Sequence, residues 1–128
     1  MADVAFLLDT NICIYALKGF SEPLREHMAR QASGALAVST ISLAEISVGF
    51  GRAAFDAPDL AAFLRVVPPV PFDDVAARIY GMLPFRRSRF DRLIAAHALA
   101  LDLTIVTNNE ADFAGVPGLR IENWTLPA

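Results

Sequence analysis

The sequence has little cysteine or histidine and no long apolar run. Cys13 is its only cysteine and it has two histidines in 128 residues, so neither a disulfide framework nor a Cys/His zinc site is expected. Asp9 interrupts the apolar residues 4–8, and no run approaches the roughly 18 residues that cross a bilayer. The N-terminus, with Asp3 and no basic segment, does not resemble a signal peptide. We therefore expect no membrane contact, and we expect Cys13 to be a buried, reduced thiol in a cytoplasmic protein.

An excess of positive charge is also missing. The chain has 11 lysines and arginines and 14 aspartates and glutamates, which gives a net charge of −3. This balance disfavours a protein that wraps nucleic acid electrostatically. It leaves open an enzyme that meets nucleic acid through bound cations, because a cation in a carboxylate cluster inverts the local sign.

The apolar pattern alternates between short strands and helices. Expected strands cover residues 4–8, 36–38, 104–106 and 119–121, and residues 66–72 are expected to be extended because of their prolines. Expected helices cover residues 12–17, 23–30, 41–50, 60–65, 75–83 and 92–101. With 55% apolar residues, the chain is predicted to be one α/β domain, residues 1–128. Its sheet is expected to be mostly parallel, with four to five strands flanked by helices on both faces.

Acidic residues recur where the predicted strands end. Asp9 follows the first strand, Glu45 lies in the helix after the second, and Asp91 opens the helix before residues 104–106. Ligands of such folds bind at the carboxyl ends of the strands, and hard oxygen ligands select Mg²⁺ or Mn²⁺. These acids predict a metal site. Asp9 and Asp91 could alternatively be helix N-caps only.

Several segments resemble the motifs of PIN-domain nucleases. Residues 7–11 (LLDTN) resemble the opening motif, and residues 39–46 with Gly49 resemble the segment of the second acid. Residues 90–98 and 104–109 resemble the third and fourth motifs. The closing residues 113–124 are similar to the C-terminus of VapC toxins of bacterial VapBC toxin–antitoxin pairs. The resemblance spans essentially the whole chain in order, and it implies a PIN-like, metal-dependent endoribonuclease.

The resemblance implies a site and a mechanism. Asp9, Glu45 and Asp91 would be catalytic and hold one or two Mg²⁺, with Mn²⁺ as a substitute. Water would then attack an RNA phosphodiester in line, leaving 5′-phosphate and 3′-hydroxyl ends. Asn109 stands where many PIN domains have aspartate, so we expect Asp112 to be the fourth acid. The residues expected to support them are Thr10, Ser39, Thr107 and Asn109.

The densest basic cluster consists of Arg86, Arg87, Arg89 and Arg92. It is expected to hold RNA phosphates beside Asp91, or else to be a solvated loop and helix start. His97 lies on an apolar helix face and is interpreted as a packed core or interface residue, as is Trp124 at the sheet edge.

The resemblance also implies partners. These are a second copy in a homodimer and a VapB-type antitoxin whose C-terminal segment covers the acidic pocket with an arginine or lysine. The helices near residues 21–30 and 41–50 are expected to form its groove.

Three alternatives stay open. The chain could be a PIN nuclease of RNA processing outside a toxin pair, or a catalytically silent RNA-binding module. It could also be a phosphatase or receiver domain, although Asn11 occupies the position where an aspartate-nucleophile phosphatase would need a second acid. The sequence does not identify the RNA.

Overall fold

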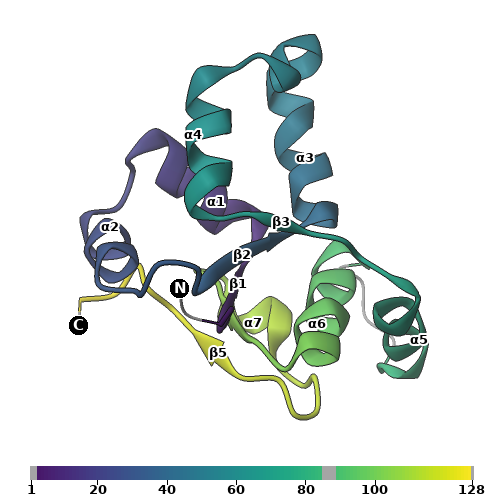
Figure 1. Ribbon diagram of the computed structural model, residues 1–128. Coiled ribbons are helices and arrows are strands. Elements are labelled where there is room, and N and C mark those ends of the chain that lie inside the picture. Colours follow the sequence, from purple (N-terminus) through teal and green to yellow (C-terminus); the bar gives the residue numbers. More distant parts are fainter. Residues whose placement is uncertain (1–2, 85–88, 128) are drawn as a thin grey trace.

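The computed structural model describes residues 3–84 and 89–127, without the side chain of Arg89. Five parallel strands form one sheet in the order β3-β2-β1-β4-β5 (Figure 1). This confirms the predicted α/β fold. Among the described residues, no helix is long and apolar enough to span a membrane. The strands are β1 (Phe6–Leu8), β2 (Leu36–Ser39), β3 (Pro69–Val70), β4 (Thr104–Val106) and β5 (Ile121–Glu122).

The helices agree with the expected segments in most places. They are α1 (Thr10–Lys18), α2 (Glu22–Ala29), α3 (Thr40–Phe50), α4 (Pro58–Val66), α5 (Asp74–Met82), α6 (Arg89–Leu101) and α7 (Glu110–Phe113). A 3-10 helix, η1 (Gly51–Phe55), and the short α7 were not expected. The last strand begins at Ile121, later than expected. Helix α6 begins before Asp91, so Asp91 lies in its first turn and is not its N-cap.

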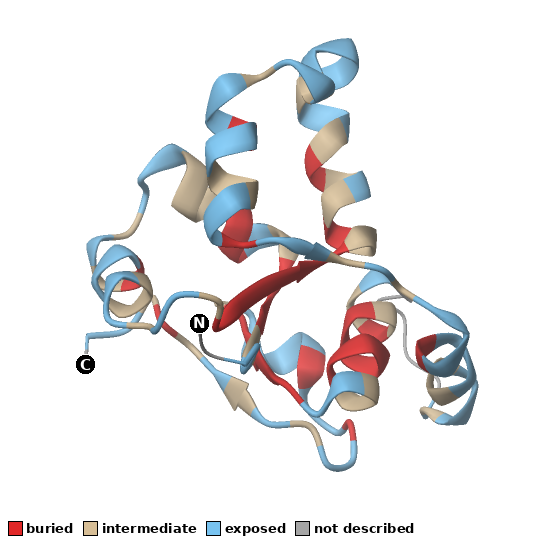
Figure 2. Cartoon of the chain, viewed as in Figure 1, coloured by how far each residue is buried: buried red, intermediate tan, exposed pale blue. Residues whose placement is uncertain are grey.

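Alternate side chains of the central strands form two cores, one on each face of the sheet. On one face, strand residues pack with α1, α2, α3 and α4, and on the other they pack with α6 and α7. The central strands β1, β2 and β4 are almost continuously buried, whereas β3 and β5 at the sheet edges are not (Figure 2). Burial on both faces explains why the strands have near-continuous apolar sequences. The first core contains Leu8, Val38 and Val106, and the second contains Leu7, Ala37 and Ile105.

Polar caps fix where the helices begin after the strands. Asp9 caps α1 by accepting a hydrogen bond from the backbone N–H of Ile12, and Ser39 caps α3 in the same way from Ile41. Gly19 ends α1 in the left-handed region at φ 68°, which glycine adopts without strain. These local signals, predicted from the sequence, direct both helices away from the same edge of the sheet.

The direction of the strand order reverses at β1. The chain progresses outward from β1 to β2 and β3, and then returns to place β4 on the other side of β1. Leu8 pairs with Val106 in the β1–β4 register, so Asp9 and Thr107 follow directly from adjacent strands. In open parallel sheets, this reversal point is where ligands bind.

Candidate active site

Asp9 is the buried centre of the candidate site. Only 3% of its surface is exposed. One carboxylate oxygen, Oδ1, accepts a hydrogen bond from the N–H of Ile12 at 2.9 Å, and Oδ2 accepts one from the hydroxyl of Thr107 at 2.5 Å. The Thr107 oxygen in turn accepts a hydrogen bond from the backbone N–H of Asn109 at 2.9 Å. Asp9 is therefore both a helix cap and a residue held by the end of the neighbouring strand.

The electrostatics of Asp9 place two further carboxylates near it. Burial raises the pKa of Asp9 from its ordinary 3.8 to about 6, although the hydrogen bonds from Thr107 and Ile12 oppose the change. The negative charges of Asp91 and Glu45 raise this pKa further. Three acids that are far apart in the sequence thus share one electrostatic environment.

The other two acids reach this environment from different helices. Glu45 is half-buried in α3, and its Oε1 accepts a hydrogen bond from the hydroxyl of Thr10 at 2.7 Å. Asp91 lies in the first turn of α6, where the helix dipole favours a negative charge. Thr10 and Thr107 therefore each donate a hydrogen bond to one of these acids, and their role in supporting a metal stays a prediction.

The donor chemistry of the three acids fits a hard divalent cation. Carboxylate oxygens are the ligands that Mg²⁺ and Mn²⁺ prefer, and Asn108 adds a buried amide oxygen that has no hydrogen-bond partner in the structure. Among the described residues, however, no three acidic, histidine or cysteine side chains form a closed metal-binding group. Mutual repulsion opposes tighter clustering of the carboxylates unless a cation lies among them.

Asp112 and Asn109 lie at the rim of the site. Both are exposed, and the side-chain amide of Asn109 donates a hydrogen bond to the Asp112 carboxylate. The carboxylates that act on Asp9 are those of Asp91 and Glu45, whereas Asp112 is linked to Asp9 through Asn109 and Thr107. The role of Asp112 as fourth acid remains a prediction.

The expected basic cluster is only partly within the described structure. Arg86 and Arg87 lie outside the described residues, as does the side chain of Arg89. Arg92 is 3% exposed, which corrects the expectation that it belongs to an exposed basic surface. Arg92 follows the first turn of α6, on the face of the helix that packs into the protein. Its position next to the other arginines in the sequence gave no indication of this burial.

Ser39 lies at the start of α3, where it caps the helix and meets α6. Its hydroxyl is paired with the buried ring of His97 at 2.8 Å, across 58 positions of sequence. The sequence places both residues in apolar surroundings but contains no signal that they meet. The structure thus supports the expected packing of His97 and adds a specific polar partner.

Comparisons with known proteins identify the family of the chain. The family model described as "PIN domain" matches residues 6–119. The chain is 33% identical to the tRNA(fMet)-specific endonuclease VapC of Shigella flexneri, over 94% of this chain and 98% of the relative. It is 32% identical to ribonuclease VapC2 of Rickettsia felis, over 93% and 97% of the two chains.

A solved structure shows the same fold. The crystal structure of VapBC2 from Rickettsia felis, bound to a promoter DNA fragment, matches with a TM-score of 0.78 and 30% identity. The match covers 94% of this chain and 99% of that one. The chain therefore belongs to the PIN-domain family and, within it, to the VapC-type toxin ribonucleases.

Proposed function

We propose that this chain is the toxin of a type II toxin–antitoxin pair and cleaves RNA with Mg²⁺ held by Asp9, Glu45 and Asp91. The observation that carries the proposal is the convergence of three carboxylates at the switch point of a parallel sheet. Burial raises the pKa of Asp9 to about 6 there, and the charges of Asp91 and Glu45 add to this rise. Acids gathered in this way are stabilised by a divalent cation. Mn²⁺ is expected to substitute, and the site is expected to work in the cytoplasm, where RNA is available.

The chain's own residues would prepare the site for the cation. The hydrogen bonds from Ile12 and Thr107 favour the charged form of Asp9, which binds a cation, and partly offset the effect of burial. Thr10 fixes the direction of the Glu45 carboxylate. When bound, Mg²⁺ supplies positive charge for the phosphodiester and activates water for its hydrolysis. Arg86, Arg87 and Arg89 remain the predicted contacts to RNA phosphates.

An antitoxin partner is part of the proposal, and the surface offers hollows for an extended or helical segment. One hollow of about 330 Å³ is lined by α1 and α3 and includes Glu45, Lys18 and Asp59. A segment in this hollow would reach the carboxylates, where an antitoxin arginine or lysine could replace the cation. The solved relative from Rickettsia felis is itself a VapBC complex.

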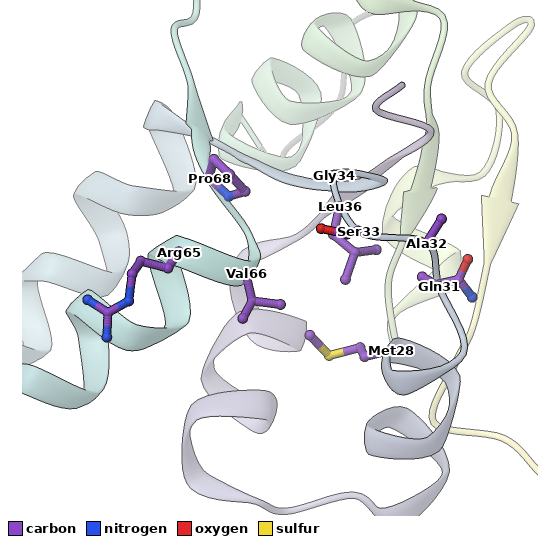
Figure 3. Close-up of a pocket in the computed structure, with 9 residues that line it drawn as sticks. All are labelled: Met28, Gln31, Ala32, Ser33, Gly34, Leu36, Arg65, Val66 and Pro68. Carbon is purple, nitrogen blue, oxygen red and sulfur yellow. The ribbon is translucent and has the colours of Figure 1, made fainter. Parts of the chain in front are cut away.

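The antitoxin groove expected near α2 and α3 stays a prediction, and a hollow between α2 and α4 offers a further binding surface. A second hollow of about 330 Å³ lies beside the loop after α2 and the end of α4 (Figure 3). Met28 and Val66 extend toward each other across it, whereas the guanidinium group of Arg65 points away (Figure 3). A third hollow shares Met28 and Val66 and continues along α1. We expect these apolar walls to bind the antitoxin and a separate face to form the homodimer.

Mapping new RNA ends tests the proposal. Brief expression of the wild-type chain should create discrete 5′-phosphate ends in cellular RNA, first sought in tRNA because of the name of the Shigella relative. Expression of Asp9→Asn should not. Co-expression of a small gene directly upstream should suppress the ends. Absence of new ends with wild-type protein present would refute the nuclease proposal, and cleavage unaffected by any neighbouring gene would favour RNA processing outside a toxin pair.

A separate prediction concerns the fourth acid. If Asp112 supports the cation directly, Asp112→Asn should raise the Mg²⁺ concentration for half-maximal cleavage more than Asn109→Ala does. Supporting residues of a metal site change affinity roughly 10–100-fold. A Mg²⁺ titration of cleavage by the two purified variants measures this. A shift confined to Asn109→Ala would assign the role to Asn109, whose side chain holds Asp112.

A further inference from the structure

His97 connects the helix of Asp91 to the start of the helix that carries Glu45. It lies six residues after Asp91 in α6 and is 1% exposed. Its Nδ1 is 2.8 Å from Oγ of Ser39, the N-cap of α3. Glu45 lies within the second turn of the helix that Ser39 caps. The two helices that deliver acids to Asp9 are thus joined by a buried side-chain hydrogen bond.

The hydroxyl of Ser39 serves two partners at this corner. Its Oγ accepts the backbone N–H of Ile41 at 3.1 Å and is also hydrogen-bonded to Nδ1 of His97 at 2.8 Å. A hydroxyl can make both bonds, since it offers one donor and two acceptor positions. Burial lowers the pKa of His97, although the charge of Asp73 and the backbone of Pro71 oppose this, which agrees with a neutral ring.

A second hydrogen bond at the same corner does not involve α6. Oγ1 of Thr40 accepts the backbone N–H of Phe72 at 3.0 Å, which ties the start of α3 to the segment before α5. The ring of Phe72 packs edge-on against His97, with centroids 5.4 Å apart. Thr40 therefore offers a matched control, because it stabilises the same corner without linking the two acid-bearing helices.

We propose that His97 is a positioning residue that, through Ser39, holds α3 and α6 at the separation at which Glu45 and Asp91 share a cation beside Asp9. The proposal rests on the metal-dependent function proposed above. The carboxylates repel one another, so their helices need a fixed connection to keep them together. A neutral hydrogen bond provides this connection without adding another charge near the acids.

The test compares Ser39→Ala, His97→Leu, their double variant, His97→Asn and Thr40→Val. Binding of Mn²⁺ to each folded protein is measured by calorimetry, alongside Mg²⁺-dependent cleavage. Ser39→Ala and His97→Leu should each weaken Mn²⁺ binding roughly 10–100-fold, and the double variant should be little worse than either. His97→Asn keeps an acceptor near the position of Nδ1 and should restore much of the binding. Thr40→Val should change stability but not Mn²⁺ binding.

Wild type, the two single variants and the double variant form a double-mutant cycle. Ser39→Ala also removes the N-cap of α3, but it does so with either residue at position 97, so this effect cancels from the coupling between Ser39 and His97. If His97→Leu does not fold, Ser39→Ala and a long-range ¹H–¹⁵N spectrum of wild-type protein decide the question. The spectrum should show a neutral ring held in one tautomer; exchange between the two tautomers would overturn the proposal. Normal Mn²⁺ binding by Ser39→Ala, or strictly additive effects, would also overturn it. If wild-type protein itself neither binds Mn²⁺ nor cleaves RNA, the proposed function fails instead.

Discussion

Asp9→Asn, Glu45→Gln and Asp91→Asn should each reduce Mg²⁺-dependent RNA cleavage by more than about 100-fold, since even residues that only support metal ligands cost roughly 10–100-fold. Each substitution removes one negative charge at nearly constant volume. Asn at position 9 can still accept the N–H of Ile12 and cap α1, so the fold should survive. The measurement is kcat/KM on one RNA substrate, with circular dichroism to establish folding.

Asp102→Asn is the matched control for these three variants. Asp102 is exposed, pairs with Arg120 at 3.1 Å, and has a left-handed backbone at φ 56°, which asparagine also adopts readily. Loss of an exposed ion pair costs little stability. This variant should cleave RNA at a rate near that of wild type. A folded Glu45→Gln protein that did the same would remove Glu45 from the site, and the same reasoning applies to each acid.

The second large effect concerns the stability of the metal-free protein. The pKa of Asp9 is raised to about 6 from 3.8, so the folded state binds this proton more tightly than the unfolded state does. The resulting stabilisation is complete below pH 3.8 and is lost as the pH rises through about 6. It corresponds to about 3 kcal/mol. The free energy of unfolding of Asp9→Asn should therefore exceed that of wild type at pH 7.5, and the difference should shrink toward pH 4.

A divalent cation should offset most of this difference. Mg²⁺ or Mn²⁺ at about 100 times its dissociation constant adds roughly 2.7 kcal/mol to the stability of a protein that binds it only when folded. Wild-type protein should gain this at pH 7.5, and Asp9→Asn should gain little. Denaturant unfolding with and without metal, at several pH values, measures both effects. The lowered pKa of His97 makes the folded state more stable as the pH rises. This contribution is the same in wild type and Asp9→Asn, so it cancels when the two proteins are compared.

Asp91→Asn provides an independent check on the same charge cluster. Removing the charge of Asp91 should lower the pKa of Asp9, since that charge raises it in the wild type. A ¹³C carboxyl titration by NMR follows Asp9 directly. An unchanged Asp9 titration, together with a full stabilising response to Mg²⁺, would show that Asp91 only serves the first turn of α6.

Local sequence determined most of the elements. Apolar runs bounded by polar residues predicted β4 at its observed bounds, and Asp9 caps α1 as the sequence allowed. Such signals act within a few residues, so they are readable without the fold. Because parallel strands share one carboxyl edge, the same signals also predicted that Asp9, Glu45 and Asp91 would converge.

Only the tertiary structure decided which side chains meet across the fold. The strand order places Thr107 on Asp9, 98 positions away, and the packing of α6 against α3 brings His97 to Ser39. The tertiary structure also buries Arg92, which the sequence analysis had grouped with an exposed basic cluster. It places α2 beside α4 around the hollow lined by Met28 and Val66. These contacts depend on how helices and strands pack. The apolar pattern of one segment shows which of its own faces is buried, but it does not show which other segment packs against that face.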